Sequence, residues 1–176
     1  HNRCRRQRQM CIRDSNGETQ HEYQGYLFTL FDSVGGRQYE VDNLNQLEGV
    51  GRFLGRIHKA SAGKTFQHRP TISLDEYLYQ PRKILENSQF IPTHLENAFF
   101  NDVDLLIKEL ENQWPSNIEN IRLHGDCHPG NILWRDGPMF VDLDDSRNGP
   151  AVQDLWMLLN GERQDKLMQL DILLES

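Results

Sequence analysis

The densest cluster of polar side chains in the sequence is the run His124–Asn131, and Asp142 follows eleven positions after its end. Two glycines and a proline within the run disfavour a helix, so we expect a loop that presents the carboxylate of Asp126. With Asn131 and Asp142, this gives one amide oxygen and two carboxylates. Hard oxygen ligands of this kind are what Mg²⁺ prefers when phosphate groups supply the others.

These residue types suit the transfer of a phosphoryl group. In such a reaction one Asp orients the acceptor hydroxyl and takes its proton, while an Asn and another Asp hold the metal ion on the nucleotide phosphates. Catalysis then consists of positioning and charge neutralisation rather than covalent chemistry. The pattern therefore indicates phosphoryl-transfer chemistry at this cluster.

A β-hairpin is expected to bring Asn131 and Asp142 close together. The apolar runs Asn131–Trp134 and Met139–Leu143 flank an Asp-Gly pair, which is a strong hairpin signal. Asn131 opens the first strand and Asp142 lies near the end of the second. Both should face the carboxylate of Asp126 on the preceding loop.

Before this cluster the sequence predicts one strand and then a long helix. Gly25–Phe31 is rich in aromatic residues and is typical of a strand. The helix should follow Asp42, a good N-cap residue, and end at Gly63. Its apolar side chains recur at three- and four-residue steps and form one stripe. They are Leu44, Leu47, Val50, Leu54 and Ile57.

Two Ser/Thr-x-x-Glu sequences predict the starts of two further helices. The first, Ser73–Glu76, opens a helix that Pro81 should kink or interrupt. The second, Thr93–Glu96, opens an amphipathic helix that ends near Trp114. Its apolar positions are Leu95, Phe99, Val103, Leu106 and Leu110. A buried helix is also expected over residues 151–160.

The composition allows a folded domain and excludes several classes of protein. Of the 176 residues, 37% are hydrophobic and 26% are charged, which can build a core and excludes wholesale disorder. The longest apolar runs, such as Tyr26–Phe31, are far too short to span a membrane. A net charge of −7 disfavours nucleic-acid binding. Three scattered cysteines do not form a disulfide framework, so we expect a reducing, cytoplasmic location.

The first fourteen residues differ from the rest of the chain. They carry five Arg and one Asp, a charge of +4, which leaves −11 for the remaining residues. A basic arm for nucleic acid is one interpretation. The stretch also resembles translated adapter sequence, and we favour this second interpretation. We therefore expect residues 1–14 to be a non-native or disordered leader.

The run His-Gly-Asp-x-His-x-Gly-Asn, followed by Phe-Val-Asp, resembles the catalytic core of the aminoglycoside phosphotransferase and choline kinase group, which are relatives of protein kinases. Over about residues 20–165 the sequence is similar to the stress response kinase A group, which are bacterial protein Ser/Thr kinases of this fold. That narrower resemblance rests on five stretches. They are Val34–Gln38, His68–Ile72, Glu76–Leu78, Asn131–Asp145 and Arg147–Gly161.

The resemblance implies an α+β, protein-kinase-like fold. It consists of a mostly helical large lobe with a catalytic-loop β-hairpin, plus the last strand and the hinge of the small lobe. The resemblance also implies that Asp126 is the catalytic base and that Asn131 and Asp142 bind Mg²⁺, with Asp142 counted among the catalytic residues and ATP as co-substrate. The hinge, whose backbone would contact adenine, corresponds to Phe31, Asp32, Ser33 and Val34.

The sequence departs from the family pattern in one large respect. A complete kinase of this type has a small lobe with a phosphate-covering loop and a Lys that grips the phosphates, and no Lys precedes Lys59 here. We therefore expect an internal fragment of a longer protein. Residues 15–34 would be the end of the small lobe and the hinge, and residues 35–176 a C-terminally truncated large lobe.

Several residues near the cluster have a structural interpretation beside the functional one. The side chains of His124, Cys127 and His128 could bind zinc, but their spacing suits a helix, which this loop disfavours. We expect His124 to brace the loop and Cys127 to fill the core. Asp144 and Asp145 could bind a second metal ion or cap the following turn, and we favour the structural role.

Two further features lie outside the cluster. Asp154 is implied by the resemblance to hydrogen-bond back to the catalytic loop. Gly63–Thr65 imitates the end of a P-loop, but the position that would need a glycine holds His58. The end of a helix explains Gly63 better.

Three functions are consistent with the sequence. The extended resemblance favours an ATP- and Mg²⁺-dependent protein Ser/Thr kinase. The acidic body would also suit a small-molecule kinase acting on an aminoglycoside, choline or an amino-alcohol, since cationic substrates favour carboxylates around the cleft. The missing phosphate-gripping Lys favours a non-catalytic binding scaffold. We expect a monomer whose partners are ATP and a hydroxyl acceptor, with no nucleic acid and no membrane.

Overall fold

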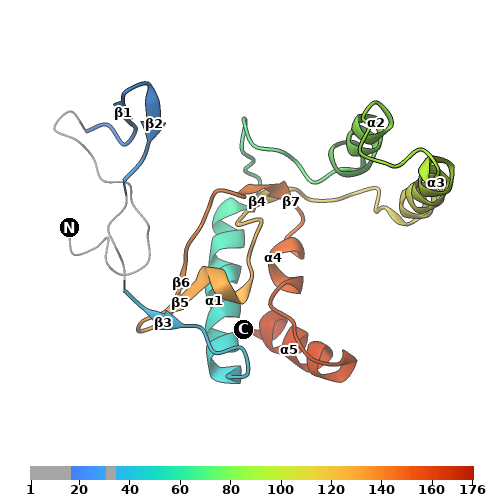
Figure 1. Ribbon diagram of the computed structural model, residues 1–176. Coiled ribbons are helices and arrows are strands. Elements are labelled where there is room, and N and C mark those ends of the chain that lie inside the picture. Colours follow the sequence, from blue (N-terminus) through green and yellow to red (C-terminus); the bar gives the residue numbers. More distant parts are fainter. Residues whose placement is uncertain (1–16, 31–34) are drawn as a thin grey trace. The chain divides into compact units, whose positions relative to one another are not determined.

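The computed structural model describes residues 17–30 and 35–176, so the expected leader and the expected hinge at Phe31–Val34 lie outside the described residues. The described chain divides into two compact units, whose helices and strands are labelled in Figure 1. Unit 1 contains residues 17–30, 35–53, 127–143 and 157–176. Unit 2 contains residues 54–126 and 144–156. Each unit carries part of the polar cluster.

Unit 1 contains an antiparallel sheet in the order β3-β5-β6. Its strands are β3 (Arg37–Gln38), β5 (Ile132–Trp134) and β6 (Pro138–Phe140). Leu133 pairs with Gln38 on one side and with Met139 on the other. The turn between β5 and β6 contains Asp136 at φ 57° and Gly137 at φ 142°. The hairpin expected from the Asp-Gly pair is confirmed.

The start of helix α1 (Leu44–Ser61) packs closely on this hairpin and on helix α5 (Arg163–Glu175). A Cβ at Gly49 would lie only 2.8 Å from the Trp134 ring, and a Cβ at Gly51 would lie 3.0 Å from the Leu173 carbonyl oxygen. Phe53 stacks on Phe140 with ring centroids 5.2 Å apart. The core side chains of this unit include Leu47, Val50, Ile132, Leu158 and Leu173. This packing fixes the hairpin against α1.

The strand expected over residues 25–31 forms, but it is shorter. Strand β2 (Tyr26–Phe28) pairs antiparallel with β1 (His21–Tyr23). Gln24 at φ 51° and Gly25 at φ 82° make the turn between them. Tyr26 and Leu27 are exposed by 76% and 65%, so this hairpin has no buried face among the described residues.

Unit 2 is built around the antiparallel pair of β4 (Ile121–Leu123) and β7 (Arg147–Gly149). The buried side chain of Asn148 joins the chain between Phe66 and Thr71 to β7. Its Oδ1 accepts a hydrogen bond from Phe66 N at 2.6 Å, and its Nδ2 donates to Thr71 Oγ1 at 3.2 Å. Ile72 N donates to the Asn148 carbonyl oxygen at 2.8 Å. The loop that follows β4 carries Asp126.

The helices between α1 and β4 differ in detail from the expectation. Helix η2 (Asp75–Tyr79) is a π-helix, and α2 (Gln80–Glu86) continues it with Pro81 in its first turn. Ser73 Oγ accepts from Glu76 N at 3.2 Å, but the Glu76 carboxylate accepts from Thr71 N instead of closing the predicted box. The helix therefore continues through Pro81, and what changes just before it is the helix type, from π to α.

The capping box predicted at Thr93–Glu96 does not form, so this prediction is wrong. Helix α3 (Glu96–Gln113) begins after Leu95, and no side chain caps it, so Thr93 lies outside the helix. Its end next to Trp114 is as expected. Phe99, Val103 and Leu110 of the predicted apolar stripe are half-buried, but Leu95 and Leu106 are exposed and Ile107 is buried instead.

The helix expected over residues 151–160 is also largely wrong. Only α4 (Gln153–Trp156) forms, and it carries the fully buried Asp154, while Val152 and Trp156, two positions away on either side, are exposed. Gly161 at φ 83° turns the chain into α5 soon afterwards. Across residues 17–30 and 35–176, no helix is long and apolar enough to cross a membrane.

Candidate functional site

The carboxylate of Asp154 holds the backbone of the loop that follows β4. Oδ2 accepts a hydrogen bond from His124 N at 3.0 Å, and Oδ1 accepts from Gly125 N at 2.9 Å. The Asp154 side chain has no solvent exposure. Asp126 N follows, 3.4 Å from His124 Nδ1. The expectation that Asp154 bonds back to this loop is confirmed, and His124 contacts the backbone of Asp126 as a bracing residue would.

His58 on α1 completes the contacts of this buried carboxylate. Its Nε2 lies 3.0 Å from Asp154 Oδ2, and its side chain is 13% exposed. His58 donates this hydrogen bond in the tautomer that carries its proton on Nε2. Gln153, next to Asp154, also donates to the Gly125 carbonyl oxygen at 3.3 Å. The loop that carries Asp126 is therefore bonded through both its N–H and its C=O groups.

In unit 1 the hairpin brings Asn131 and Asp142 together, as expected. Asn131 ends the 3₁₀ turn η3 (Pro129–Asn131) directly before β5, and its carbonyl oxygen accepts from Val141 N at 3.0 Å. Asp142 follows Val141 at φ 61° and is exposed. A left-handed conformation costs a non-glycine residue energy, and such residues are frequent at functional sites. Asn131 is only 8% exposed, whereas Asp142 is exposed.

The remaining residues of the polar run have structural contacts in unit 1. His128 Nδ1 accepts from Gly130 N at 3.0 Å, and Cys127 is fully buried. The buried phenol of Tyr39 lies in the same unit. Burial is the main cause that raises its pKa to about 12, and the nearby Asp42 carboxylate and Cys127 thiol add to the shift. Among the described residues no group of three or more His, Cys, Asp or Glu side chains could hold a metal ion.

Asp144 and Asp145 are held by arginines in unit 2. The Asp144 carbonyl oxygen accepts from the guanidinium of Arg69. Arg147 donates from Nε to the Asp145 carbonyl oxygen at 2.7 Å and from Nη2 to Asp145 Oδ1 at 2.6 Å. These contacts give Asp145 a structural role, as favoured from the sequence, through an ion pair rather than a turn cap.

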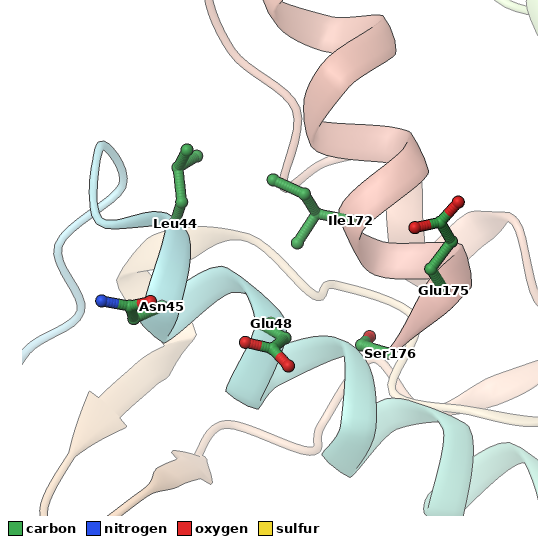
Figure 2. A pocket seen from close by; sticks show the side chains of 6 residues that line it. All are labelled: Leu44, Asn45, Glu48, Ile172, Glu175 and Ser176. Carbon is green, nitrogen blue, oxygen red and sulfur yellow. The ribbon is translucent and has the colours of Figure 1, made fainter.

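A pocket of about 290 Å³ lies elsewhere in unit 1, between the start of α1 and the end of α5 (Figure 2). Figure 2 shows Leu44 and Ile172 facing each other across it, with the carboxylates of Glu48 and Glu175 at its rim. None of the candidate catalytic or metal-binding residues lines this pocket. The pocket therefore does not include Asn131 or Asp142, the two proposed site residues that the structure describes in this unit.

Sequence reasoning did not assign a role to His58 or to Arg147. His58 and Asp154 are 96 residues apart, and a single histidine on an amphipathic helix gives no sign of its partner. Arg147 falls in a strand of only three residues. Arg147 follows an acidic pair in the sequence, which could have suggested a local ion pair.

The model of the phosphotransferase enzyme family matches residues 7–175 of the chain. Stress response kinase A from Escherichia coli (strain K12) is 56% identical over 161 residues, which is 92% of this chain and 49% of that protein. The serine/threonine protein kinase RdoA from Salmonella typhimurium is 52% identical over 161 residues, again 92% of this chain and 49% of that protein. The chain thus spans about half the length of the curated relatives it matches.

Solved structures of low sequence identity share the fold. Amicoumacin kinase hAmiN, in complex with AMP-PNP, Ca²⁺ and Ami, aligns with a TM-score of 0.70 at 17% identity, covering 95% of this chain and 55% of that one. Choline kinase LicA from Streptococcus pneumoniae aligns with a TM-score of 0.62 at 15% identity, covering 87% and 54%. The α+β, protein-kinase-like fold expected from the sequence is confirmed.

Proposed function

Because the chain belongs to the phosphotransferase enzyme family, we propose that the whole protein transfers the γ-phosphoryl group of ATP to the hydroxyl of a protein Ser or Thr. The observation that carries this proposal is the 56% identity to a stress response kinase A over 161 residues, which include the entire polar run. The reaction needs no covalent intermediate on the protein, so the role of each residue is to bind, orient or exchange a proton.

Asp126 is the proposed catalytic base. Its carboxylate would orient the acceptor hydroxyl and take its proton late in the transfer. The buried carboxylate of Asp154 supports this role, because it holds His124 N and Gly125 N directly before Asp126. A base that must lie within hydrogen-bond reach of one hydroxyl gains from a fixed backbone.

Asn131 and Asp142 are the proposed Mg²⁺ ligands. Their side chains offer one amide oxygen and one carboxylate, a donor set that fits Mg²⁺ when phosphate oxygens and water complete the coordination. The bond from Val141 N to the Asn131 carbonyl oxygen supports a shared site, since it links Asn131 to the residue before Asp142. Bound Mg²⁺ would neutralise charge on the phosphates.

The proposed adenine-binding segment is Phe31–Val34, which lies outside the described residues. The strand that follows it supports the proposal. β3 pairs with β5, and a Cβ at Gly36 would lie only 3.0 Å from Leu133 Cβ. The chain leaving the proposed hinge is therefore fixed beside the hairpin that carries the proposed metal ligands.

A small-molecule acceptor is the second candidate. It is favoured by the solved structures that share the fold, which include an amicoumacin kinase and a choline kinase. At 17% and 15% identity these structures support the fold alone, whereas the relatives above 50% identity are named as protein or stress response kinases. We therefore propose a protein acceptor, with a cytoplasmic, monomeric enzyme.

The test is phosphoryl transfer from γ-labelled ATP with Mg²⁺, using the full-length protein that carries this chain. A generic basic protein and a panel of aminoglycosides and amino-alcohols serve as acceptors, with Asp126→Ala as the control. Label on protein Ser or Thr is the expected result. Label only on small molecules would contradict a protein acceptor but would leave the proposed roles of the site residues unchanged. If the protein folds and binds nucleotide but transfers no phosphate, the proposal is wrong and the protein is a non-catalytic binding scaffold.

A further inference from the structure

The loop of Asp145–Arg147 lies directly against the loop that carries Asp126. Gly125 has φ 88°, and a Cβ there would lie 2.1 Å from the Asp145 carbonyl oxygen and 2.9 Å from Arg147 Nε. Such distances leave no room for a side chain, so the two backbones are in contact. Gly125 immediately precedes Asp126. A shift of residues 145–147 would therefore move the start of the segment that carries the proposed base.

The guanidinium of Arg147 holds this second loop in place. It donates to the backbone carbonyl and the carboxylate of Asp145, and its Nη1 donates to the hydroxyl of Tyr77. The Arg147 side chain is 20% exposed and that of Asp145 is 58% exposed, so the guanidinium is the better shielded of the two partners. A planar guanidinium donates in fixed directions, which a lysine ammonium does not reproduce. Arg147 thus fixes the Asp145 backbone where it touches Gly125.

Tyr77 is itself held in a fixed position. It lies in the π-helix η2, and π-helical turns are rare and frequent at functional sites. The chain before η2 is bonded to β7, because Ile72 N donates to the Asn148 carbonyl oxygen and Asn148 N donates to that of Pro70. The segments that carry Tyr77 and Arg147 are therefore joined twice, by the bond between these two side chains and by the backbone bonds of Pro70 and Ile72 to Asn148.

We propose that Arg147 is a positioning residue for phosphoryl transfer, which acts by holding the Asp145 backbone against Gly125 and so fixing the orientation of Asp126. Tyr77 supports it by fixing the guanidinium. This inference rests on the proposed function, in which Asp126 is the base. Arg147 contacts neither substrate in this role, so its loss should lower the rate of transfer and leave nucleotide affinity unchanged.

The test compares Arg147→Gln, Arg147→Lys and Tyr77→Phe in the full-length protein. Because small misplacement of reacting groups can cost about 100-fold in rate, we expect kcat of Arg147→Gln to fall by about that factor. The KM for ATP should stay close to the wild-type value. Arg147→Lys should recover part of kcat, and Tyr77→Phe should lose less than Arg147→Gln. Arg82→Gln is the matched control, since Arg82 bonds to Asp104 and Glu86 away from this loop.

Hydrogen exchange at the amides of Gly125 and Asp126 gives a second readout that does not depend on activity. Exchange should be faster in Arg147→Gln and Tyr77→Phe than in Arg82→Gln. If wild-type protein transfers phosphate and both Arg147 variants keep its kcat, the inference is wrong. If wild-type protein transfers none, the proposed function fails, and equal exchange in all variants would then overturn the positioning role as well. Should Arg147→Gln not fold, Tyr77→Phe and Arg147→Lys decide by the same two measurements.

Discussion

Asp154 Oδ2 lies 3.0 Å from His58 Nε2, although the two residues are 96 positions apart in the chain. The same carboxylate accepts hydrogen bonds from two successive backbone N–H groups of the loop before Asp126. A carboxylate with no solvent exposure is tolerated only when its oxygens are well bonded. These bonds link a helix to the loop that carries the proposed base.

The contacts of Asp154 lead to a prediction on stability. In Asp154→Asn one oxygen is replaced by an NH₂ group, which faces an N–H donor instead of accepting from it. A buried donor left without a partner costs about 1–3 kcal/mol. We therefore expect the free energy of unfolding, measured by urea denaturation, to fall by about 1–3 kcal/mol.

The control for this experiment is Asp102→Asn on the exposed surface of α3. Substitutions at such surface positions usually change stability by less than about 0.5 kcal/mol. Equal urea midpoints for Asp154→Asn and Asp102→Asn would contradict the role of Asp154 as the support of the loop.

The two aspartates with positive φ on the hairpin give a matched pair of substitutions. Asn tolerates the left-handed conformation, so Asp142→Asn at φ 61° and Asp136→Asn at φ 57° should both keep the fold. Asp142→Asn removes the charge of the proposed metal ligand and should abolish turnover. Asp136 lies in the turn between β5 and β6, so Asp136→Asn should keep its turnover. Near-normal activity of Asp142→Asn in the same ATP-dependent assay would be incompatible with the metal assignment.

The buried hydroxyl of Tyr39 predicts a stability change at high pH. It has no hydrogen-bond partner in the described part of the chain, and burial raises the pKa of Tyr39 from its ordinary 10.0 to about 12. An unfolded Tyr39 would ionise first, so its contribution to stability is complete below pH 10.0 and is lost as the pH rises towards 12. Tyr39→Phe should lose less stability than wild type over this interval.

At neutral pH the same variant removes an unsatisfied buried group, so Tyr39→Phe should be neutral or slightly stabilising. Tyr79→Phe is the comparison, because the Tyr79 hydroxyl donates to Glu111 Oε1 at 2.6 Å and its loss should not stabilise. Urea midpoints at neutral and alkaline pH check both statements. A marked loss of stability for Tyr39→Phe at neutral pH would contradict an unsatisfied Tyr39 hydroxyl.

Acid should weaken the link between α2 and α3. The Arg82 guanidinium donates to both carboxylate oxygens of Asp104, and its hydrogen bonds hold the pKa of that carboxyl below its usual value. The contribution of Asp104 is therefore fully present above a pH of about 4 and is lost as the pH falls through its lowered pKa. Asp104→Asn should reduce the loss of thermal stability between pH 4 and pH 2, whereas Asp102→Asn should not. Parallel curves for the two variants would contradict this ion pair.

The parts of the fold that could be predicted are those with local signals. The Asp-Gly turn identified the hairpin, and the apolar stripe of Leu47, Val50 and Leu54 identified α1, because turn chemistry and periodicity act over a few residues. The helix predicted over residues 151–160 was wrong because its local pattern was misleading. The apolar side chains of these residues suggested one buried helix, yet Val152 and Trp156 are exposed and the helix spans only Gln153–Trp156.

The contacts that support the candidate site could be predicted only in part. The resemblance implied the bonds of Asp154 to the loop, but not its partner His58, since no local pattern links residues on separate elements. The contact of Gly125 with Asp145 likewise could not be predicted from the sequence, because it depends on the close approach of two loops. The catalytic and metal-binding roles of Asp126, Asn131 and Asp142 stay predictions.

The most direct test of the proposed function is a comparison of wild type with Asp126→Asn in the full-length protein. The affinity for ATP with Mg²⁺ is measured by titration, and phosphoryl transfer is measured in a single turnover on protein Ser or Thr. We predict equal nucleotide affinity and a loss of transfer of about 100-fold or more, the range for removal of a general base. Equal transfer rates for the two proteins would contradict the assignment of Asp126 as the base and, with it, the proposed mechanism.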